Sequence, residues 1–222
     1  ALLTSVGSGI CGAAAVLGAE STIQTKPYKT AVAVATVVIF GTIAMFIYPV
    51  CYRSGLFPGL EPQQMGIFAG STLHEVAHAV GAGNAMGPEE APVTVIVKMI
   101  RVMLLVPVLL ILGFWVASKA KKSSGKGSSE TKGKVAIPWF AFGFLLVIGF
   151  NSLNLLPAGI VNFINDFDTF LLTMAMAALG AETSADKFKQ AGAKPFILAG
   201  ILFVWLIVGG YAMARYLAPI WL

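Results

Sequence analysis

Most of this sequence consists of apolar stretches long enough to enter or cross a lipid bilayer. Seven such segments follow one another, at residues 2–19, 30–50, 65–82, 92–117, 137–156, 168–181 and 195–215. A bilayer core offers no water to backbone groups, so a chain that crosses it folds as helices or as a closed barrel. Segments of about 20 apolar residues have the length of transmembrane helices. The sequence therefore predicts an all-α polytopic membrane protein.

The composition supports this class. Of the 222 residues, 57% are hydrophobic and only 11% are charged, whereas soluble domains carry about 25% charged residues. The formal net charge of +5 would suggest a nucleic-acid partner in a soluble protein. Here the basic residues lie mainly in short loops, where positive charge orients membrane proteins. We therefore expect the lipid bilayer, and not nucleic acid, as the partner.

Both histidines lie within one membrane-length segment. Residues 70–78 read Gly-Ser-Thr-Leu-His-Glu-Val-Ala-His, which places His74, Glu75 and His78 in a run that is otherwise apolar or small. An ionisable side chain at membrane depth costs about 3 kcal/mol on insertion scales and is usually functional. We predict that His74 and Glu75 carry or sense a coupling proton, since histidine titrates near physiological pH. A neutral His74 that is only hydrogen-bonded is the structural alternative.

A glycine-rich pattern occurs twice in the chain. Residues 7–15 read Gly-Ser-Gly-Ile-Cys-Gly-Ala-Ala-Ala, and an offset of 63 residues aligns them with residues 70–78. This offset pairs Gly7 with Gly70 and Ser8 with Ser71. An internal repeat joined to glycine-interrupted apolar segments is typical of secondary transporters. We predict two repeat units, residues 1–50 and 64–117, within a core of residues 1–117.

Breaks in these two segments would place unpaired N–H groups and positive helix-dipole ends at membrane depth. Such backbone is tolerated only where it lines a cavity or meets a ligand, and facing N–H ends suit an anion. The predicted substrate-binding residues are small or hydroxylated: Gly7, Ser8, Gly9, Cys11, Gly12, Gly70, Ser71 and Thr72. The alternative is that these residues only allow close helix packing.

Two basic residues near the start of the fourth segment share a helix face. Lys98 and Arg101 are three residues apart, a spacing that makes helical side chains neighbours. They could snorkel to the lipid headgroups. Alternatively, they turn inward, where they would neutralise Glu75 or an anionic substrate.

Residues 118–136 form a polar stretch with six lysines and one glutamate. Its composition predicts a flexible linker in the cytoplasm, followed by three further transmembrane helices over residues 137–222. The loop with Lys26 and Lys29 lies on the same side only if the third segment is a re-entrant hairpin. The same reasoning favours a re-entrant first segment.

The residues His74, Glu75 and His78 also fit H-E-x-x-H, which on a helix places two imidazoles beside a general base. The alternative prediction is therefore an intramembrane zinc metalloprotease with His74 and His78 as ligands. It leaves the repeat unexplained, because Cys11 and Gly12 occupy the positions of His74 and Glu75. We expect a transporter without metal, cofactor or enzyme activity.

A further signal comes from short stretches spread along the whole chain, at residues 8–16, 37–42, 70–77, 137–140, 168–172, 174–180, 191–195 and 205–210. They resemble the YeiH family of bacterial inner-membrane proteins, which is grouped with inverted-repeat carriers and often labelled a sulfate exporter. The resemblance implies export of a small anion such as sulfate by alternating access, and it leaves a homo-oligomer open. It also implies additional amino-terminal helices as partners. Glutamine is usual in the family at His78, which counts against a protease.

Overall fold

The computed structural model describes residues 1–23, 25–123, 139–153, 155–182 and 193–221, and within these ranges the chain forms helices and no strand. The all-α prediction is confirmed for them. From residue 124 onward the predicted cytoplasmic linker lies outside the described residues, whereas residues 118–123 continue a helix. The division into core, linker and three further helices stays a prediction.

In the described part of the chain, three helical spans are long and apolar enough to cross a membrane. They are α3 (Pro27–Arg53), then α6 (Glu90–Met103) with α7 (Leu105–Ser123), and α11 (Ala193–Ala212) with its extension. A helix of 27 residues is about 40 Å long, enough for a bilayer core of about 30 Å. A polytopic membrane protein is therefore confirmed, whereas the number of seven segments is not.

Prolines account for the irregularities in two of these spans. Leu104 separates α6 from α7, because Pro107 has no N–H to donate to the carbonyl of Met103 four residues earlier. At the carboxyl end, the π-helical turn η1 (Met213–Leu217) and the short α12 (Ala218–Trp221) follow α11. Pro219, inside α12, likewise lacks the N–H that would continue a regular helix.

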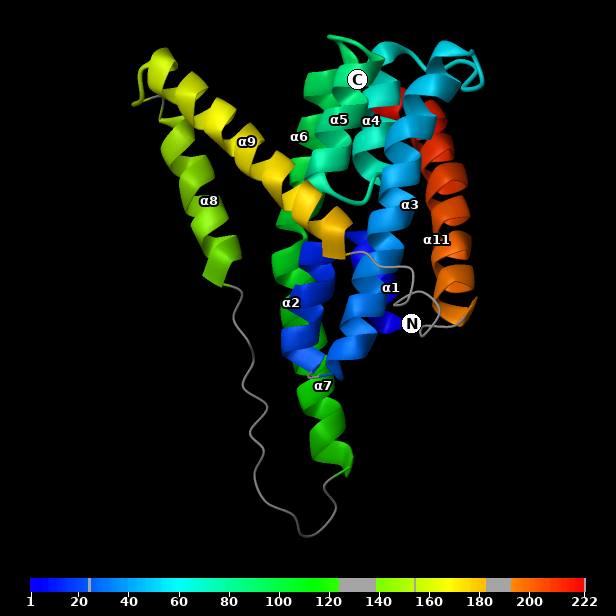
Figure 1. Ribbon diagram of the computed structural model, residues 1–222, viewed down its shortest axis with the longest axis vertical. Helices are drawn as coiled ribbons and strands as arrows, with labels where there is room; N and C mark the ends of the chain where they lie inside the picture. Colours follow the sequence, from blue (N-terminus) through cyan, green and yellow to red (C-terminus); the bar gives the residue numbers. More distant parts are fainter. Residues whose placement is uncertain (24, 124–138, 154, 183–192, 222) are drawn as a thin grey trace.

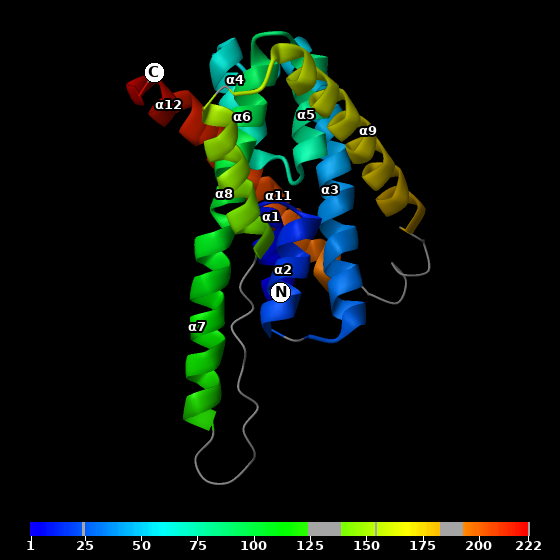
Figure 2. The ribbon, with the colours of Figure 1, turned by 90° about the vertical axis from the view of Figure 1, so that its left-hand side faces the viewer.

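The first and third predicted segments do not cross the molecule; each reverses as a helical hairpin (Figures 1 and 2). The first hairpin is α1 (Leu2–Gly9) with α2 (Ala13–Ile23), and the second is α4 (Pro62–Thr72) with α5 (Val76–Met86). A helix of 11 residues is about 17 Å long, roughly half of a bilayer core. Both segments are thus broken, as predicted, and their re-entrance into the membrane stays a prediction.

Glycines allow close helix packing at both hairpins. Gly7 on α1 packs against Val16 on α2. In the second hairpin, Gly66 on α4 and Gly83 on α5 both pack against the first turns of α6. Larger side chains at these positions would collide with the facing helix, so the small residues set the helix spacing.

The two hairpins enter from opposite ends of the molecule, and their tips meet near its middle (Figures 1 and 2). The long helix α3 and the α6–α7 pair run beside both hairpins. Helix α3 begins at the end of the molecule where α7 ends (Figure 1). The loop with Lys26 and Lys29 therefore lies at the end where the basic linker starts, as expected for a re-entrant third segment.

Each hairpin is held by its own apolar cluster. The cluster around the first hairpin includes Val16, Val37 and Leu109 from α2, α3 and α7, and the cluster around the second includes Tyr48, Phe68 and Ala214 from α3, α4 and η1. The region between the two clusters, at the tips, contains polar and charged groups instead. The apolar packing thus positions a polar centre halfway along the molecule.

Helix α9 (Ala158–Glu182) runs beside the second hairpin, and α8 (Trp139–Ser152) stands apart from both hairpins (Figure 1). The sixth apolar segment is predicted to begin at Asp168. This prediction is wrong: the helix begins at Ala158, and Asp168 lies inside it. Polar residues can occupy one face of a helix without ending it, so the polar run before Phe170 is not a helix boundary.

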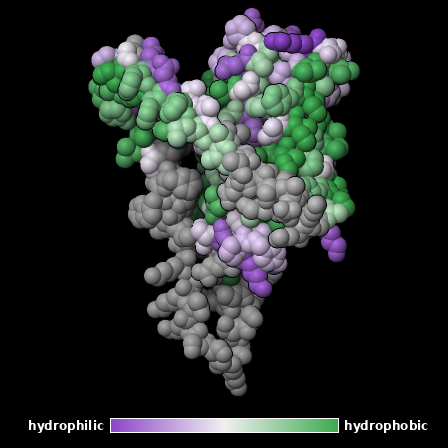
Figure 3. All heavy atoms as spheres, in the orientation of Figure 1, coloured by the Kyte–Doolittle hydropathy of each residue, from purple (hydrophilic) through white to green (hydrophobic). Residues whose placement is uncertain are grey.

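Large apolar side chains cover the outside of the molecule. Phe46 on α3, Ile111 on α7 and Trp205 on α11 are 65%, 67% and 71% exposed. Figure 3 shows hydrophobic residues gathered over the face formed by α3 and α11. A surface of this kind is matched to lipid chains rather than to water.

Candidate functional site

The tips of the two hairpins are in direct contact through Glu75. The backbone N–H of Ala13, the first residue of α2, donates to Oε1 of Glu75 at 3.3 Å. Glu75 is 7% exposed, and its carboxylate faces the positive end of the α2 dipole. A carboxylate of the second hairpin thus caps a helix of the first. The helix start that we predicted to receive a substrate anion already has an anionic partner.

Gly12 makes this contact possible. Its φ angle is +71°, and a Cβ atom on Gly12 would lie 2.5 Å from Cγ of Glu75. Residues with a side chain rarely adopt this backbone conformation. Both the turn and the approach of Glu75 therefore require glycine here.

Lys98 joins the two tips from α6. Its side chain is fully buried, and Nζ donates to the carbonyls of Ile10 at 3.0 Å, Leu73 at 2.7 Å and His74 at 2.6 Å. These three bonds use all the donors of an ammonium group. The snorkelling alternative is wrong for Lys98, because carbonyls freed by the two helix breaks compensate the loss of water around its charge.

Arg101 repeats this bridge one turn further along α6. Its guanidinium donates to the carbonyls of Ser71 and of Leu73 (3.1 Å) in the second hairpin, and to the carbonyl of Ser8 (2.9 Å) in the first. Of the two alternatives, the inward orientation holds for both cations, but their partners are carbonyls. Nε2 of His78 lies 3.9 Å from Oε2 of Glu75.

The sequence offset of 63 residues recurs in these contacts. Arg101 binds the carbonyls of Ser8 and Ser71, which are paired by the offset. Lys98 binds the carbonyls of Ile10 and Leu73, which the same offset pairs. Each cation thus receives corresponding backbone atoms from the two hairpins.

The two histidines lie at the start of the second hairpin's return arm, with no continuous helix through them. His74 lies in the break, Glu75 is the N-cap in extended conformation, and α5 begins at Val76. His78 is fully buried, and its Nε2 lies 3.3 Å from Oγ1 of Thr42 on α3. The H-E-x-x-H motif needs both imidazoles on one helix, which this break prevents. No group of three potential metal ligands occurs among the described residues.

The predicted hydroxyl groups have different surroundings. Ser71 and Thr72 donate to the carbonyl of Phe68 in their own helix, at 3.0 and 2.7 Å. Oγ of Ser8 is buried and has no hydrogen-bond partner among the described residues, and the same holds for Nδ1 of His74. Ser8 and His74 therefore retain free hydrogen-bonding capacity beside the tips.

The other predicted binding residues have packing roles or open surroundings. Cys11 is buried in the apolar cluster of the first hairpin. Gly7 and Gly70 face close neighbours on α2 and α6, whereas Gly9 has open space around it. The close-packing alternative thus describes Gly7 and Gly70.

Sequence reasoning missed the backbone partners of the two cations and the contribution of α3. The carbonyls of Ile10 and Leu73, which Lys98 binds, carry no side-chain signal. Thr42 on α3 approaches His78, and Gly41 leaves room for the His78 ring, which a Cβ atom would approach to 2.5 Å. The adjacent Gly-Thr pair within an apolar span was the signal available for this contact.

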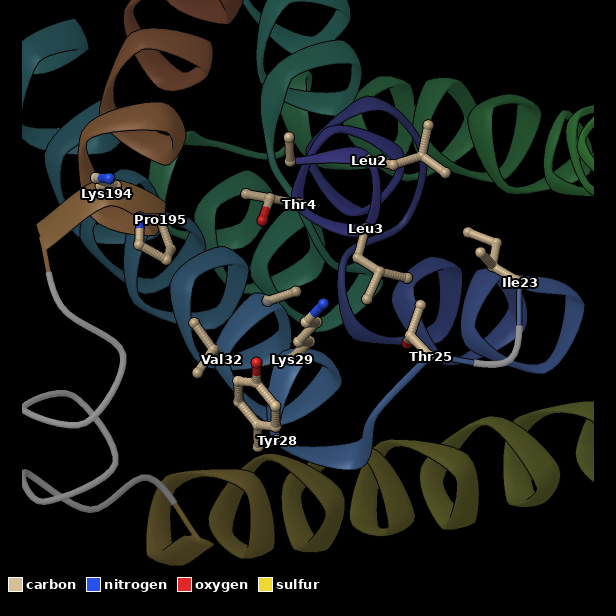
Figure 4. Close-up of a pocket in the computed structure, with 12 residues that line it drawn as sticks. Leu2, Leu3, Thr4, Ile23, Thr25, Tyr28, Lys29, Val32, Lys194 and Pro195 are labelled. Atoms are coloured by element: carbon tan, nitrogen blue, oxygen red, sulfur yellow. The ribbon is translucent and has the colours of Figure 1, made fainter.

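A cavity of about 480 Å³ opens at the end of the molecule where α3 begins. Figure 4 shows Lys29 from α3 and Thr4 from α1 directed toward the same space, with Lys194 at its edge. Thr4 and Ser8 are both buried, and their spacing of four residues puts them on one face of α1. A polar face of α1 thus leads from this cavity to the hairpin tips.

Comparison with known proteins supplies the family. The model of the family described as conserved hypothetical protein 698 matches residues 1–199. A UPF0324 membrane protein of Bacteroides thetaiotaomicron is 65% identical over 219 residues, covering 99% of this chain and 64% of the relative. The UPF0324 inner membrane protein YeiH of Escherichia coli K12 is 51% identical over 211 residues, covering 95% of this chain and 59% of the relative.

A third relative, from Bordetella bronchiseptica, is 50% identical over 216 residues and has the same type of name. This chain spans 59% to 66% of the length of these relatives. No solved structure matches. The chain belongs to the family of conserved hypothetical protein 698, whose relatives are named UPF0324 membrane proteins.

Proposed function

We propose that this chain forms the substrate-binding core of a secondary transporter that exports a small anion such as sulfate across the bacterial inner membrane. The observation that carries the proposal is the bridge that Lys98 and Arg101 make between two opposed hairpin tips. Interrupted helices that meet midway through a membrane are the usual site of substrate binding in secondary transporters. The recurring offset of 63 supports an internal repeat behind this arrangement.

The charge balance at the tips favours an anion. Lys98 and Arg101 bring two positive charges, and Glu75 brings one carboxylate. The buried Ser8 hydroxyl and the His74 imidazole add unused hydrogen-bonding groups. We propose that the anion binds beside Ser8 and Arg101. It does not bind at the N–H groups that begin α2, because Glu75 already occupies that helix end.

The distribution of lysines supports the orientation. The start of α3, where Lys26 and Lys29 lie, and the end of α7, where the basic linker starts, share one end of the molecule (Figure 1). Basic loops stay in the cytoplasm. The cavity at Lys29 would then be a cytoplasmic entrance for the anion, which agrees with export. In this proposal, His74 and Glu75 carry the coupling proton.

The two bridges bear on how such a transporter moves. Lys98 and Arg101 each hold carbonyls from both hairpins, so separating the tips would leave several buried polar groups unpaired, at a cost of about 1–3 kcal/mol each. We therefore propose that the hairpins move together as one body during alternating access. Further helices of the full-length protein, or a second copy of the chain, would be the frame against which they move.

Ser8→Ala tests the proposed anion site. The Ser8 hydroxyl has no partner among the described residues, so its removal should leave the thermal unfolding midpoint unchanged. Loss of a hydrogen bond to an anion should raise the KM for labelled sulfate in proteoliposomes by about tenfold or more. The matched control is Ser71→Ala, whose hydroxyl bonds its own helix. Equal KM values for the two variants would contradict the proposed site.

The zinc protease alternative makes a separate prediction. It requires stoichiometric zinc that is lost in His78→Gln. His74 lies in the helix break and His78 lies in α5, so the two imidazoles do not share one helix as the zinc motif requires. We therefore expect elemental analysis of the purified full-length protein to find far less than one zinc per chain. Stoichiometric zinc that depends on His78 would favour the protease over the transporter.

A further inference from the structure

A second cavity lies on the other side of the central site, between α5 and α9. Its volume is about 470 Å³, and residues of α3 and α6 complete its wall. Val76 and Ala77, at the start of α5, line one part of it. Helix α9 packs against α5 at this place, and Figure 1 shows α9 running obliquely beside the second hairpin.

The cavity receives the polar face of α9. Asn165, Asp168, Thr169 and Thr173 line it, and their spacing of three and four residues places them on one face of a helix. Outside this lining, α9 exposes large apolar side chains, which include Phe163, Phe167, Phe170 and Met174, and also the polar Asn162 and Asp166. Polar side chains gathered on one side of a mainly apolar helix direct that side toward water or a ligand.

The polar atoms of this face are mainly acceptors. The hydroxyl of Thr169 donates to the carbonyl of Asn165, and that of Thr173 donates to the carbonyl of Thr169, both at 2.8 Å. Their oxygen lone pairs remain available to the cavity. Asp168 adds a carboxylate and is the one ionisable side chain among the described residues that line it. Carboxylate and hydroxyl oxygens bind small cations and hold water.

Part of the cavity lining lies next to Glu75 in the chain. Val76 and Ala77 follow Glu75 directly in the chain, and the Glu75 carboxylate bridges the tips through Ala13 and lies 3.9 Å from His78. A cation or proton that enters along α9 would arrive one residue away from the one carboxylate of the tips. The lysine-lined cavity of the opposite end has the reverse charge.

We propose that the cavity between α5 and α9 is a water-filled, cation-selective path to Glu75, with Asp168 as the group that selects for positive charge. The ligand class is a small monovalent cation, either a metal ion or a proton carried by water. The assignment of this path to ion coupling rests on the proposed transport function. The path itself and its charge preference do not depend on transport.

Cysteine labelling tests the path in membranes that contain the full-length protein. Thr173→Cys lines the cavity, and Met174→Cys is the matched control, since Met174 is 54% exposed but lies outside the lining. Both are made in a Cys51→Ala background that keeps the buried Cys11. We expect Thr173→Cys to react with a cationic methanethiosulfonate about tenfold faster than with an anionic one. Met174→Cys should react slowly with both.

Two further variants assign the charge preference. Asp168→Asn should bring the two rates at Thr173→Cys close together, whereas Asp166→Asn, on the same helix but outside the cavity lining, should leave their ratio unchanged. Slower labelling in sodium chloride than in choline chloride would identify the ligand as a metal ion. A charge preference without sodium protection would identify protons as the ligand.

The proposal is overturned if Thr173→Cys labels no faster than Met174→Cys, or if Asp168→Asn leaves the preference for the cationic reagent intact. Neither result depends on transport. A protein that shows the charge-selective labelling but moves no tested anion would contradict the proposed function and leave the path standing.

Discussion

Lys98→Met is expected to be the most damaging single substitution in the described part of this chain. Methionine is of similar length but donates no hydrogen bond, so the carbonyls of Ile10, Leu73 and His74 would lose the partner that joins them. An unsatisfied buried polar group costs about 1–3 kcal/mol, so the three together should lower the free energy of unfolding by about 3 kcal/mol or more. Thermal unfolding in detergent, followed by intrinsic fluorescence, measures this loss.

The matched control is Lys26→Met, which removes the same charge at an exposed loop position. It should unfold at the wild-type temperature. Size-exclusion chromatography at low temperature distinguishes a folded but less stable Lys98→Met protein from one that never folds. Either result agrees with a bridge from Lys98 to both hairpins. A Lys98→Met protein as stable as the control would show that Lys98 does not hold the two hairpins together.

Gly12→Ala is expected to have the second largest effect. Alanine would have to adopt a φ of +71° and place its Cβ 2.5 Å from Cγ of Glu75. The left-handed conformation alone costs about 1–2 kcal/mol, and displacing Glu75 would also remove the cap that it provides to Ala13. We expect a lower unfolding temperature together with a large fall in anion flux in proteoliposomes.

Gly9 offers a control three residues earlier in the same glycine-rich run. A Cβ atom there would meet nothing within 4 Å, and its φ is not in the left-handed region. Gly9→Ala should therefore leave stability and flux unchanged or slightly improve stability, because alanine favours the helix. Equal behaviour of the two alanine variants would mean that the contact between Gly12 and Glu75 is not needed.

The elements of this fold could largely be predicted from local sequence. Long apolar stretches become helices because backbone groups have to be paired within the chain where no water reaches them. The glycine runs around Gly12 and before His74 marked two breaks, and the charges of Lys26 and Lys29 favoured hairpins over crossings. The error at Asp168 arose because a polar residue was taken as a boundary, whereas it belongs to one face of α9.

What only the tertiary structure decided is which group each polar atom meets. Lys98 reaches the carbonyl of Ile10, 88 residues away in the chain, and Glu75 reaches the N–H of Ala13 across 62 residues. The composition of a segment fixes its helix and its polarity, because these depend on neighbours within a turn or two. The partner of a buried charge depends on which backbone ends other segments bring to it. For this reason the sequence by itself determined that ionisable residues lie at membrane depth, and the tertiary structure determined that two cations turn inward and bridge the hairpin tips.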